Sequence, residues 1–356
     1  MKNVIHQKLF VVYFLLLCII PVGTMYFFSS DLAENRALSD FPSLVTEEGF
    51  NTDFFDECST YVAEHFAFRA ELVALDSELK YKLFHSPSDS QVILGKEDWM
   101  FFEGSLKDYA GVTMSAEEID ALADKLGDVC AYYEGLGKEA VFMLVPNKNT
   151  IYPEYMPESF GEPATVTNRT MLQNALEKRE VPYLDVAGIL LAGKETDELY
   201  LHQDTHWNNT GARLVLNALY EKLGVDFAYT LEDYTVEISH ESDLSKILFP
   251  TKENLEAQRS YPQVHAFSYQ KRVRSMDDLN IASTTEEGVG KSIYLYRDSF
   301  GRAMIPYMAE VFDEAYFNRS TPYDLSYAAE TDCDYVVIEI VERNIPDLCE
   351  IMIPQK

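Results

Sequence analysis

Basic residues are scarce in this sequence. Among 356 residues, 29 Lys and Arg stand against 59 Asp and Glu, which gives a formal net charge of −30. A chain of that charge repels phosphate backbones and gains nothing from counterion release, so we expect no nucleic-acid partner. A polyanionic substrate or an anionic membrane surface would need a local basic patch to overcome the same repulsion.

Cysteine is also sparse, and its spacing matches no common metal or disulfide pattern. None of the five cysteines forms a C-x-x-C pair, and one lies inside an apolar stretch; they are Cys18, Cys58, Cys130, Cys333 and Cys349. We therefore expect no zinc site, no disulfide framework and no cofactor.

One long apolar run is present, at the N-terminus. Residues 9–28 (LFVVYFLLLCIIPVGTMYFF) carry no charge, and about 20 apolar residues span a bilayer as a helix. Lys2 and Lys8 precede the run, and acidic residues follow it, so the positive-inside rule places the N-terminus in the cytoplasm. We predict a cytoplasmic tail over 1–8, a single-pass signal-anchor over 9–28, and an extracytoplasmic location for the remainder. A cleaved signal peptide and a buried core helix are the alternatives.

Residues 29–105 are predicted to form a juxtamembrane stalk with helical and hairpin segments. The stretch 34–44 is polar and contains proline, whereas 54–83 has apolar residues at helical spacing. At 90–102, SQVILGKEDWMFF combines a β-type run, a turn and an aromatic run, which is typical of a hairpin.

Helices alternate with short apolar strands over residues 106–356. Ser115 is placed to cap a helix that stops at Gly135, and a strand over 140–145 follows. A second helix and strand repeat this order, which predicts a parallel sheet covered on both faces. Residues 225–290 lack long periodic runs and are interpreted as an insertion. Three further strands then end in polar clusters, where open parallel sheets bind ligands.

Ser299 follows the predicted strand 292–296 and precedes Phe300, Gly301 and a helix. A strand-to-helix turn there would expose the hydroxyl, and the backbone N–H groups of Phe300 and Gly301 would suit a developing oxyanion. A simple helix N-cap is the alternative for Ser299.

The segment LYLHQDTHW offers the partners that a serine nucleophile needs. Asp204 and His206 are two residues apart, so in an extended loop their side chains share one side and the carboxylate can orient the imidazole. A metal site is the competing interpretation, but a third or fourth ligand of the right type is not nearby. We expect His202 to be a bystander and Trp207 to shield the site from water.

Together these segments resemble the DHHW and alginate O-acetyltransferase (AlgJ- and AlgX-like) family, which is related to the SGNH hydrolases. The matching stretches keep their order along the chain and include ENRALSDFP, VILGKEDWMFF, VPNKNTIYPEYMP, DTHWNNTGA, ESDLSKIL and YRDSFGRAMIPYM. The resemblance implies an SGNH-hydrolase-like (flavodoxin-like) α/β fold, circularly permuted, with Asp204, His206 and Ser299 as a catalytic triad.

The sequence departs from the SGNH pattern in two places. Arg297 stands where a GDS motif has glycine, and no Gly-x-Asn-Asp follows, so a side-chain oxyanion donor is not assigned. Tentative substrate-binding residues are Lys148, Arg302, Arg343, Asn344 and Trp207; for the charged ones a solvated surface position is the alternative.

The resemblance implies transfer of an acetyl group through an acetyl-serine to a cell-surface or secreted polysaccharide. The acetyl donor would come from a membrane-bound O-acyltransferase. The net charge favours a neutral or amino-sugar acceptor over a uronate polymer. The same triad with water as acceptor would be a carbohydrate esterase or deacetylase, and a non-catalytic glycan-binding or assembly protein is the third alternative.

Overall fold

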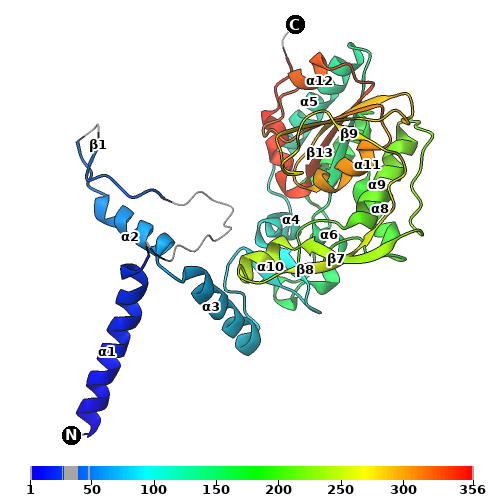
Figure 1. Ribbon diagram of the computed structural model, residues 1–356. Helices are drawn as coiled ribbons and strands as arrows, with labels where there is room; N and C mark the ends of the chain where they lie inside the picture. Colours follow the sequence, from blue (N-terminus) through cyan, green and yellow to red (C-terminus); the bar gives the residue numbers. More distant parts are fainter. Residues whose placement is uncertain (1, 26, 28–38, 47–48, 355–356) are drawn as a thin grey trace. The chain divides into compact units, whose positions relative to one another are not determined.

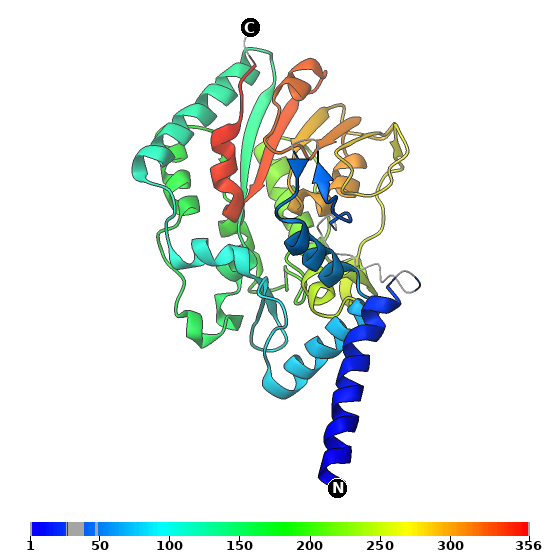
Figure 2. The same ribbon diagram turned by 90° about the vertical axis from the view of Figure 1, so that its left-hand side faces the viewer.

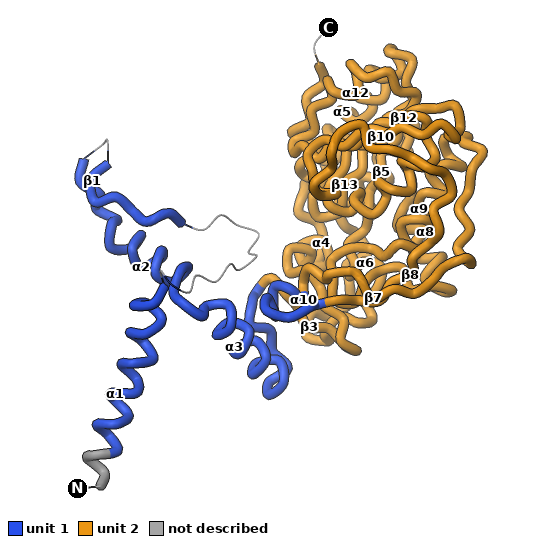
Figure 3. The backbone as a smooth tube through the Cα atoms, viewed as in Figure 1, with its two compact units in different colours: residues 1–90, 245–254 blue, residues 91–244, 255–356 orange. Residues whose placement is uncertain are grey.

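The computed structural model describes residues 2–25, 27, 39–46 and 49–354. The chain divides into two compact units, which Figure 3 colours separately. The first unit comprises Met1–Ser90 and Ser245–Asn254, and the second comprises Gln91–Leu244 and Leu255–Lys356.

The first unit contains the apolar N-terminal helix. Helix α1 spans Lys2–Gly23, and its stretch His6–Gly23 has a mean hydropathy of 1.7 with none of it buried. The length and composition of this helix suit a membrane span. The described residues do not include residues 26 and 28 of the predicted anchor or 29–38 of the predicted stalk. The predicted helical stretch 54–83 forms two helices. The elements that follow α1 in this unit are β1 (Val45–Thr46), β2 (Gly49–Phe50), α2 (Phe54–His65) and α3 (Arg69–Phe84).

The predicted hairpin forms, but it groups with the second unit rather than with the stalk. Strands β3 (Val92–Leu94) and β4 (Met100–Phe102) pair antiparallel. Met100 N–H donates to His202 O at 2.8 Å, and the Trp99 ring stacks on Tyr155 with centroids 4.5 Å apart. These contacts attach the hairpin to the α/β unit.

A seven-stranded sheet forms the centre of the second unit (Figure 1). Its strands, in spatial order, are β6 (Tyr183–Leu184), β5 (Glu139–Val145), β13 (Tyr335–Val341), β11 (Ser292–Tyr296), β12 (Glu314–Asn318), β10 (Asn280–Thr284) and β9 (Ser268–Tyr269). The first five are parallel, as predicted. The last two strands, β10 and β9, come from the predicted insertion 225–290 and pair antiparallel. Part of the predicted insertion therefore belongs to the central sheet.

Both faces of this sheet are buried, which explains the continuous apolar strands. In β5, Val141, Met143 and Val145 belong to one core cluster, while alternate residues such as Phe142 and Leu144 belong to the other. This is the two-residue alternation of a strand between two helical layers. The helices contributing to the first cluster include α8 (Val186–Gly193), α9 (Asn209–Lys222) and α11 (Ile305–Ala309). Those contributing to the second are α5 (Ala116–Glu134), α7 (Asn168–Lys178) and α12 (Ser326–Glu330). Figure 2 shows α5 beside β5.

The local signals that start α5 are present in the structure. The Ser115 side chain accepts from Glu118 N–H, and the Glu118 carboxylate accepts from Ser115 N–H, which completes a capping box.

The remaining elements of the second unit are short. They are η1 (Glu103–Ser105), α4 (Leu106–Ala110), α6 (Lys148–Ile151), η2 (Pro153–Tyr155), η3 (Glu158–Phe160), the hairpin β7 (Thr235–Glu241) and β8 (Leu255–Ser260), η4 (Phe300–Met304) and η5 (Glu342–Glu350). Helix α10 (Asp243–Leu248) begins in the second unit and continues into the first. Strands β11 and β13 lie side by side, so the turn after Tyr296 and the turn after Val341 open at the same edge of the sheet.

Candidate active site

Ser299, His206 and Asp204 lie in a hydrogen-bonded row. His206 Nε2 is 2.8 Å from Ser299 Oγ, and His206 Nδ1 is 2.7 Å from Asp204 Oδ1. Because an ionised carboxylate only accepts, Nδ1 carries the proton and Nε2 is left to accept from the serine hydroxyl. This is the arrangement in which an imidazole can remove the proton of a serine nucleophile.

The loop that carries Asp204 and His206 is closed at its base. Tyr200 and Trp207 form an isolated antiparallel bridge, and Leu201 N–H donates to His206 O at 3.2 Å. Helix α9 starts directly afterwards, where the Asn208 side chain caps it by accepting from Gly211 N–H.

The Lys148 side chain binds the backbone of this loop, whereas the sequence analysis placed it among the substrate-binding residues. Its Nζ donates to the carbonyl oxygens of Leu201 (3.0 Å), His202 (2.9 Å) and Asp204 (2.5 Å). The residue is only 4% exposed. All three ammonium donors are therefore used within the protein, and the side chain positions the Asp204 backbone.

The Glu256 carboxylate, from β8, binds backbone N–H groups of the loop that carries Asp204 and His206. Glu256 Oε2 accepts from His202 N–H at 2.7 Å, and Glu256 Oε1 accepts from Gln203 N–H at 2.9 Å. The His202 side chain points elsewhere, since its Nε2 lies 2.7 Å from Glu198 Oε1 and its ring stacks on Trp99. It makes no contact with the row of three residues, in line with its expected role as a bystander.

Asp204 has a second histidine partner that the sequence interpretation missed. His240 Nε2, from β7, lies 3.0 Å from Asp204 Oδ2, and Asp243 N–H donates to the same oxygen at 2.9 Å. Burial alone would raise the pKa of Asp204, but His206 and His240 hold it well below its ordinary value of 3.8. The carboxylate therefore stays ionised and able to orient His206.

The Ser299 turn is fixed by its neighbour Asp298. Asp298 Oδ1 accepts from Phe300 N–H and Oδ2 accepts from Val341 N–H, both at 2.8 Å. Phe300 N–H is thus already engaged, and its predicted role as an oxyanion donor is wrong in this geometry. Gly301 remains as the backbone donor predicted from the sequence. A Cβ at that position would lie 2.6 Å from Arg297 Cβ, so only glycine fits.

A cavity of about 380 Å³ opens beside Ser299. Its lining comes from the loop with His206, the turn with Ser299, helix α9, the β7–β8 hairpin and the loop before β10. The lining residues are His206, Trp207, Asn209, His240, Gln258, Ser275, Met276, Ser299, Phe300, Arg302 and Ala303.

The remaining predicted substrate-binding residues fall into two groups. Arg302 lines the cavity, and so does Trp207, although Trp207 is only 1% exposed and its Nε1–H donates to Phe300 O at 3.0 Å. Arg343 and Asn344 are not part of the cavity lining among the described residues. Arg343 donates to Asn147 Oδ1 at 3.0 Å and lies behind Phe300, its guanidinium 5.5 Å from the ring centroid.

One cluster near the site has ligand types that suit a metal. Asp204, His206 and Asp243 each place one atom within 4.8 Å of the others. The Asp204 to His206 hydrogen bond occupies two of these atoms, and a cation bound between them would have to break it. The hydrogen-bonded row therefore accounts for these side chains more directly than a metal does.

The part of the chain that contains Asp204 and His206 matches one protein-family model. Residues 92–279, just over half of the chain, match the model described as "SGNH hydrolase-like domain, acetyltransferase AlgX". The matched range includes Asp204, His206 and His240.

Curated relatives and solved structures agree with that match. The chain is 27% identical over 145 residues to a probable alginate O-acetylase AlgJ of Pseudomonas putida, covering 40% of this chain and 36% of that protein. It is 24% identical over 184 residues to the AlgJ of Pseudomonas syringae, covering 52% and 46%. The chain thus spans less than half the length of these curated relatives.

Two solved structures share the fold. A DHHW family protein from Eubacterium siraeum aligns with a TM-score of 0.53 at 14% identity, covering 74% of this chain and 99% of that one. Bacillus cereus PatB1 with a sulfonyl adduct aligns with a TM-score of 0.53 at 16% identity, covering 71% and 97%.

Proposed function

We propose a polysaccharide O-acetyltransferase function for this chain, which belongs to the SGNH hydrolase-like family of the acetyltransferase AlgX. One observation carries the proposal: the continuous row from Ser299 Oγ through His206 to the fully buried Asp204 carboxylate. The AlgJ relatives named as alginate O-acetylases support the choice of reaction.

The first half-reaction makes an acetyl-enzyme. His206 Nε2 takes the proton of Ser299 as Oγ attacks the acetyl carbonyl, and the negative oxygen of the tetrahedral intermediate faces the Gly301 N–H. The C–O bond to the donor then breaks, and His206 returns the proton to the leaving oxygen. Asp204 keeps the imidazole in the right tautomer and stabilises its protonated form.

The second half-reaction uses a sugar hydroxyl. His206 removes the hydroxyl proton, the sugar oxygen attacks the acetyl-serine carbonyl, and the Ser299 Oγ bond breaks while His206 gives the proton back to Oγ. Water in place of the sugar would give hydrolysis, so the acceptor cavity decides between a transferase and an esterase. Trp207 and Arg302 line that cavity.

The proposal includes a location and a donor. Helix α1 would anchor the chain in the membrane, with the N-terminus in the cytoplasm and the α/β unit outside. A membrane-bound O-acyltransferase would deliver acetyl groups to the site, and no further cofactor is needed for this chemistry.

The test uses the full-length protein in detergent with a chromogenic acetyl ester, with and without oligosaccharide acceptors. We expect ester turnover by the wild type, loss of turnover in Ser299→Ala, and acetyl groups on the sugar when an acceptor is present. Free acetate as the product with every acceptor would make it an esterase. Glycan binding without any ester turnover would favour the non-catalytic alternative.

A further inference from the structure

A short basic run stands out in this acidic chain. Lys271, Arg272 and Arg274 occupy three of four consecutive positions, all exposed. Across the ranges that the structure describes, none of these three side chains has a hydrogen-bond or ion-pair partner. Because carboxylates outnumber basic residues about two to one in the sequence, three neighbouring cations without a carboxylate partner need an explanation.

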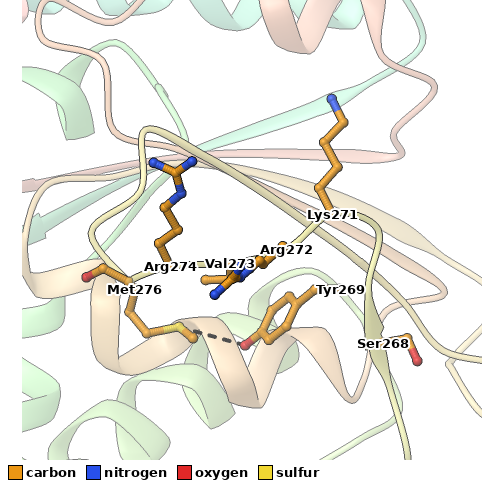
Figure 4. Close-up of a pocket in the computed structure, with 8 residues that line it drawn as sticks. Ser268, Tyr269, Lys271, Arg272, Val273, Arg274 and Met276 are labelled. Carbon is orange, nitrogen blue, oxygen red and sulfur yellow. Dashed lines mark hydrogen bonds between the residues drawn. The ribbon is translucent and has the colours of Figure 1, made fainter.

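The three cations line an open surface depression of about 480 Å³ (Figure 4). Its lining is the loop from β9 toward β10, comprising Ser268, Tyr269, Lys271, Arg272, Val273, Arg274, Ser275 and Met276. Ser275 and Met276 also line the cavity beside Ser299, so the depression and this cavity share a wall. The basic loop is therefore adjacent to the cavity that contains Ser299.

The residue that follows strand β11, Arg297, binds the backbone of the wall that the depression and the cavity share. The Arg297 guanidinium, fully buried two residues before Ser299, donates to Met276 O and to Asp278 O. Tyr269 Oη adds a contact of 3.7 Å to Met276 Sδ, which is the dashed line in Figure 4. The arginine that replaces the glycine of a GDS motif thus ties the basic loop to the Ser299 turn.

Asp277, which follows the basic run, is paired with two arginines outside that run. Asp277 lies between Arg302 Nη1 (3.5 Å) and Arg319 Nη1 (2.9 Å). Asp278 accepts from the backbone N–H of Arg274 at 2.7 Å. Residues 268–276 contain three basic and no acidic residues, so the loop carries a net positive charge, although the chain as a whole is strongly negative.

We infer that the loop 268–276 is a cationic subsite for a carboxylate or phosphate group on the acceptor glycan. This inference rests on the proposed acetyltransferase function. The basic loop is the local patch that an anionic acceptor needs against a net charge of −30, and it reverses the expectation of a neutral or amino-sugar polymer. Its shared wall with the Ser299 cavity favours a glycan over a membrane surface, because the bound group then lies beside the reacting hydroxyl.

The test compares two triple variants of the full-length protein with equal changes in net charge. The first is Lys271→Ala/Arg272→Ala/Arg274→Ala; the control is Lys107→Ala/Lys178→Ala/Lys222→Ala, which removes three exposed lysines elsewhere in the same unit. Acceptors are an oligouronate, a phosphate-bearing oligosaccharide and a neutral glucan oligosaccharide. If the loop variant has a raised KM for the oligouronate, the subsite binds a carboxylate; if it has a raised KM for the phosphate-bearing oligosaccharide, the subsite binds a phosphate.

We expect the loop variant to raise KM for the anionic acceptor about tenfold, since each exposed charge pair contributes modestly. Its kcat, its KM for the neutral glucan and its turnover of a small neutral acetyl ester should match the control. Added salt should raise the wild-type KM for the anionic acceptor and leave that of the loop variant almost unchanged.

Equal KM values for all acceptors in both variants would overturn the subsite. So would loss of binding to phosphatidylglycerol vesicles with unchanged acceptor kinetics, since this would assign the loop to a membrane. If the wild type acetylates no acceptor, the proposed function fails, and direct binding of the anionic oligosaccharides to wild type and loop variant still decides the subsite.

Discussion

His240 Nε2 lies 3.0 Å from Asp204 Oδ2, on the side of the carboxylate opposite His206. Oδ1 accepts from the backbone N–H of His206 at 2.8 Å and from its Nδ1 at 2.7 Å, while Oδ2 accepts from His240 and from Asp243 N–H. Four donors therefore fix the orientation of a carboxylate that is fully buried. Gln258 Nε2 lies 3.4 Å from His240 Nδ1, which fits a neutral imidazole that donates through Nε2.

Removing this second histidine should lower kcat more than it alters KM, although His240 also lines the cavity beside Ser299. In His240→Ala one buried lone pair of Asp204 loses its donor, at a cost of about 1–3 kcal/mol. Asp204 stabilises protonated His206, so this cost falls on the transition state, and kcat drops about tenfold to a hundredfold while KM for a small acetyl ester changes by a smaller factor. His240→Gln should recover most of the activity, because its amide nitrogen can replace Nε2.

The control is His202→Ala, a histidine in the loop that carries Asp204 and His206 but without contact to the triad. Steady-state kinetics on a chromogenic acetyl ester, measured from pH 5 to 9, should show a shifted pH profile for His240→Ala and not for His202→Ala. An equal loss of kcat in both variants would mean that the loop as a whole was damaged and that His240 has no special role.

Lys148 should matter for stability more than for acceptor binding. Lys148→Met leaves the buried carbonyls of Leu201, His202 and Asp204 without their donor, so the free energy of unfolding should fall by about 2–4 kcal/mol. Urea denaturation measures this loss, with the exposed Lys107→Met as the control. An unchanged stability together with a raised acceptor KM would restore the substrate-binding role that the sequence suggested.

Asp108 gives a stability effect that depends on pH. Burial and then the Glu342 carboxylate raise the pKa of Asp108 from 3.8 to about 6. Since the folded pKa exceeds the unfolded one, the stability due to this group is complete below pH 3.8 and lost as the pH rises through 6. Asp108→Asn should therefore gain stability relative to the wild type at pH 7.5, and the gap should narrow at pH 4.5. Denaturation curves at both pH values check this, and a gap that widens on acidification would contradict it.

Features encoded in neighbouring residues could be predicted from the sequence. The Ser115 cap, the hairpin at 92–102 and the Asp204–His206 pair depend on spacings of a few positions, and the structure shows the corresponding cap, hairpin and hydrogen bond. The meeting of this pair with Ser299, 93 residues later, required the family resemblance.

Other features of the site had no such local signal. His240 comes from a bulged strand in a segment without periodicity, although it adjoins the quoted stretch ESDLSKIL. Lys148 binds backbone carbonyl groups, and because every residue has one, the sequence does not show which of them a lysine will bind. The engagement of Phe300 N–H by Asp298 depends on side-chain geometry within a turn, which the sequence does not specify.

In the proposed reaction Ser299 carries the acetyl group, and rapid acid quenching tests this step directly. Full-length protein is mixed with a small acetyl ester in the absence of an acceptor and quenched in acid within milliseconds to seconds, and its peptides are analysed by mass spectrometry. We predict one acetyl group per chain, located on Ser299, forming far more slowly in His206→Ala, absent in Ser299→Ala, and released when an oligosaccharide acceptor is added. Acetylation of another residue at full rate in Ser299→Ala would contradict the account.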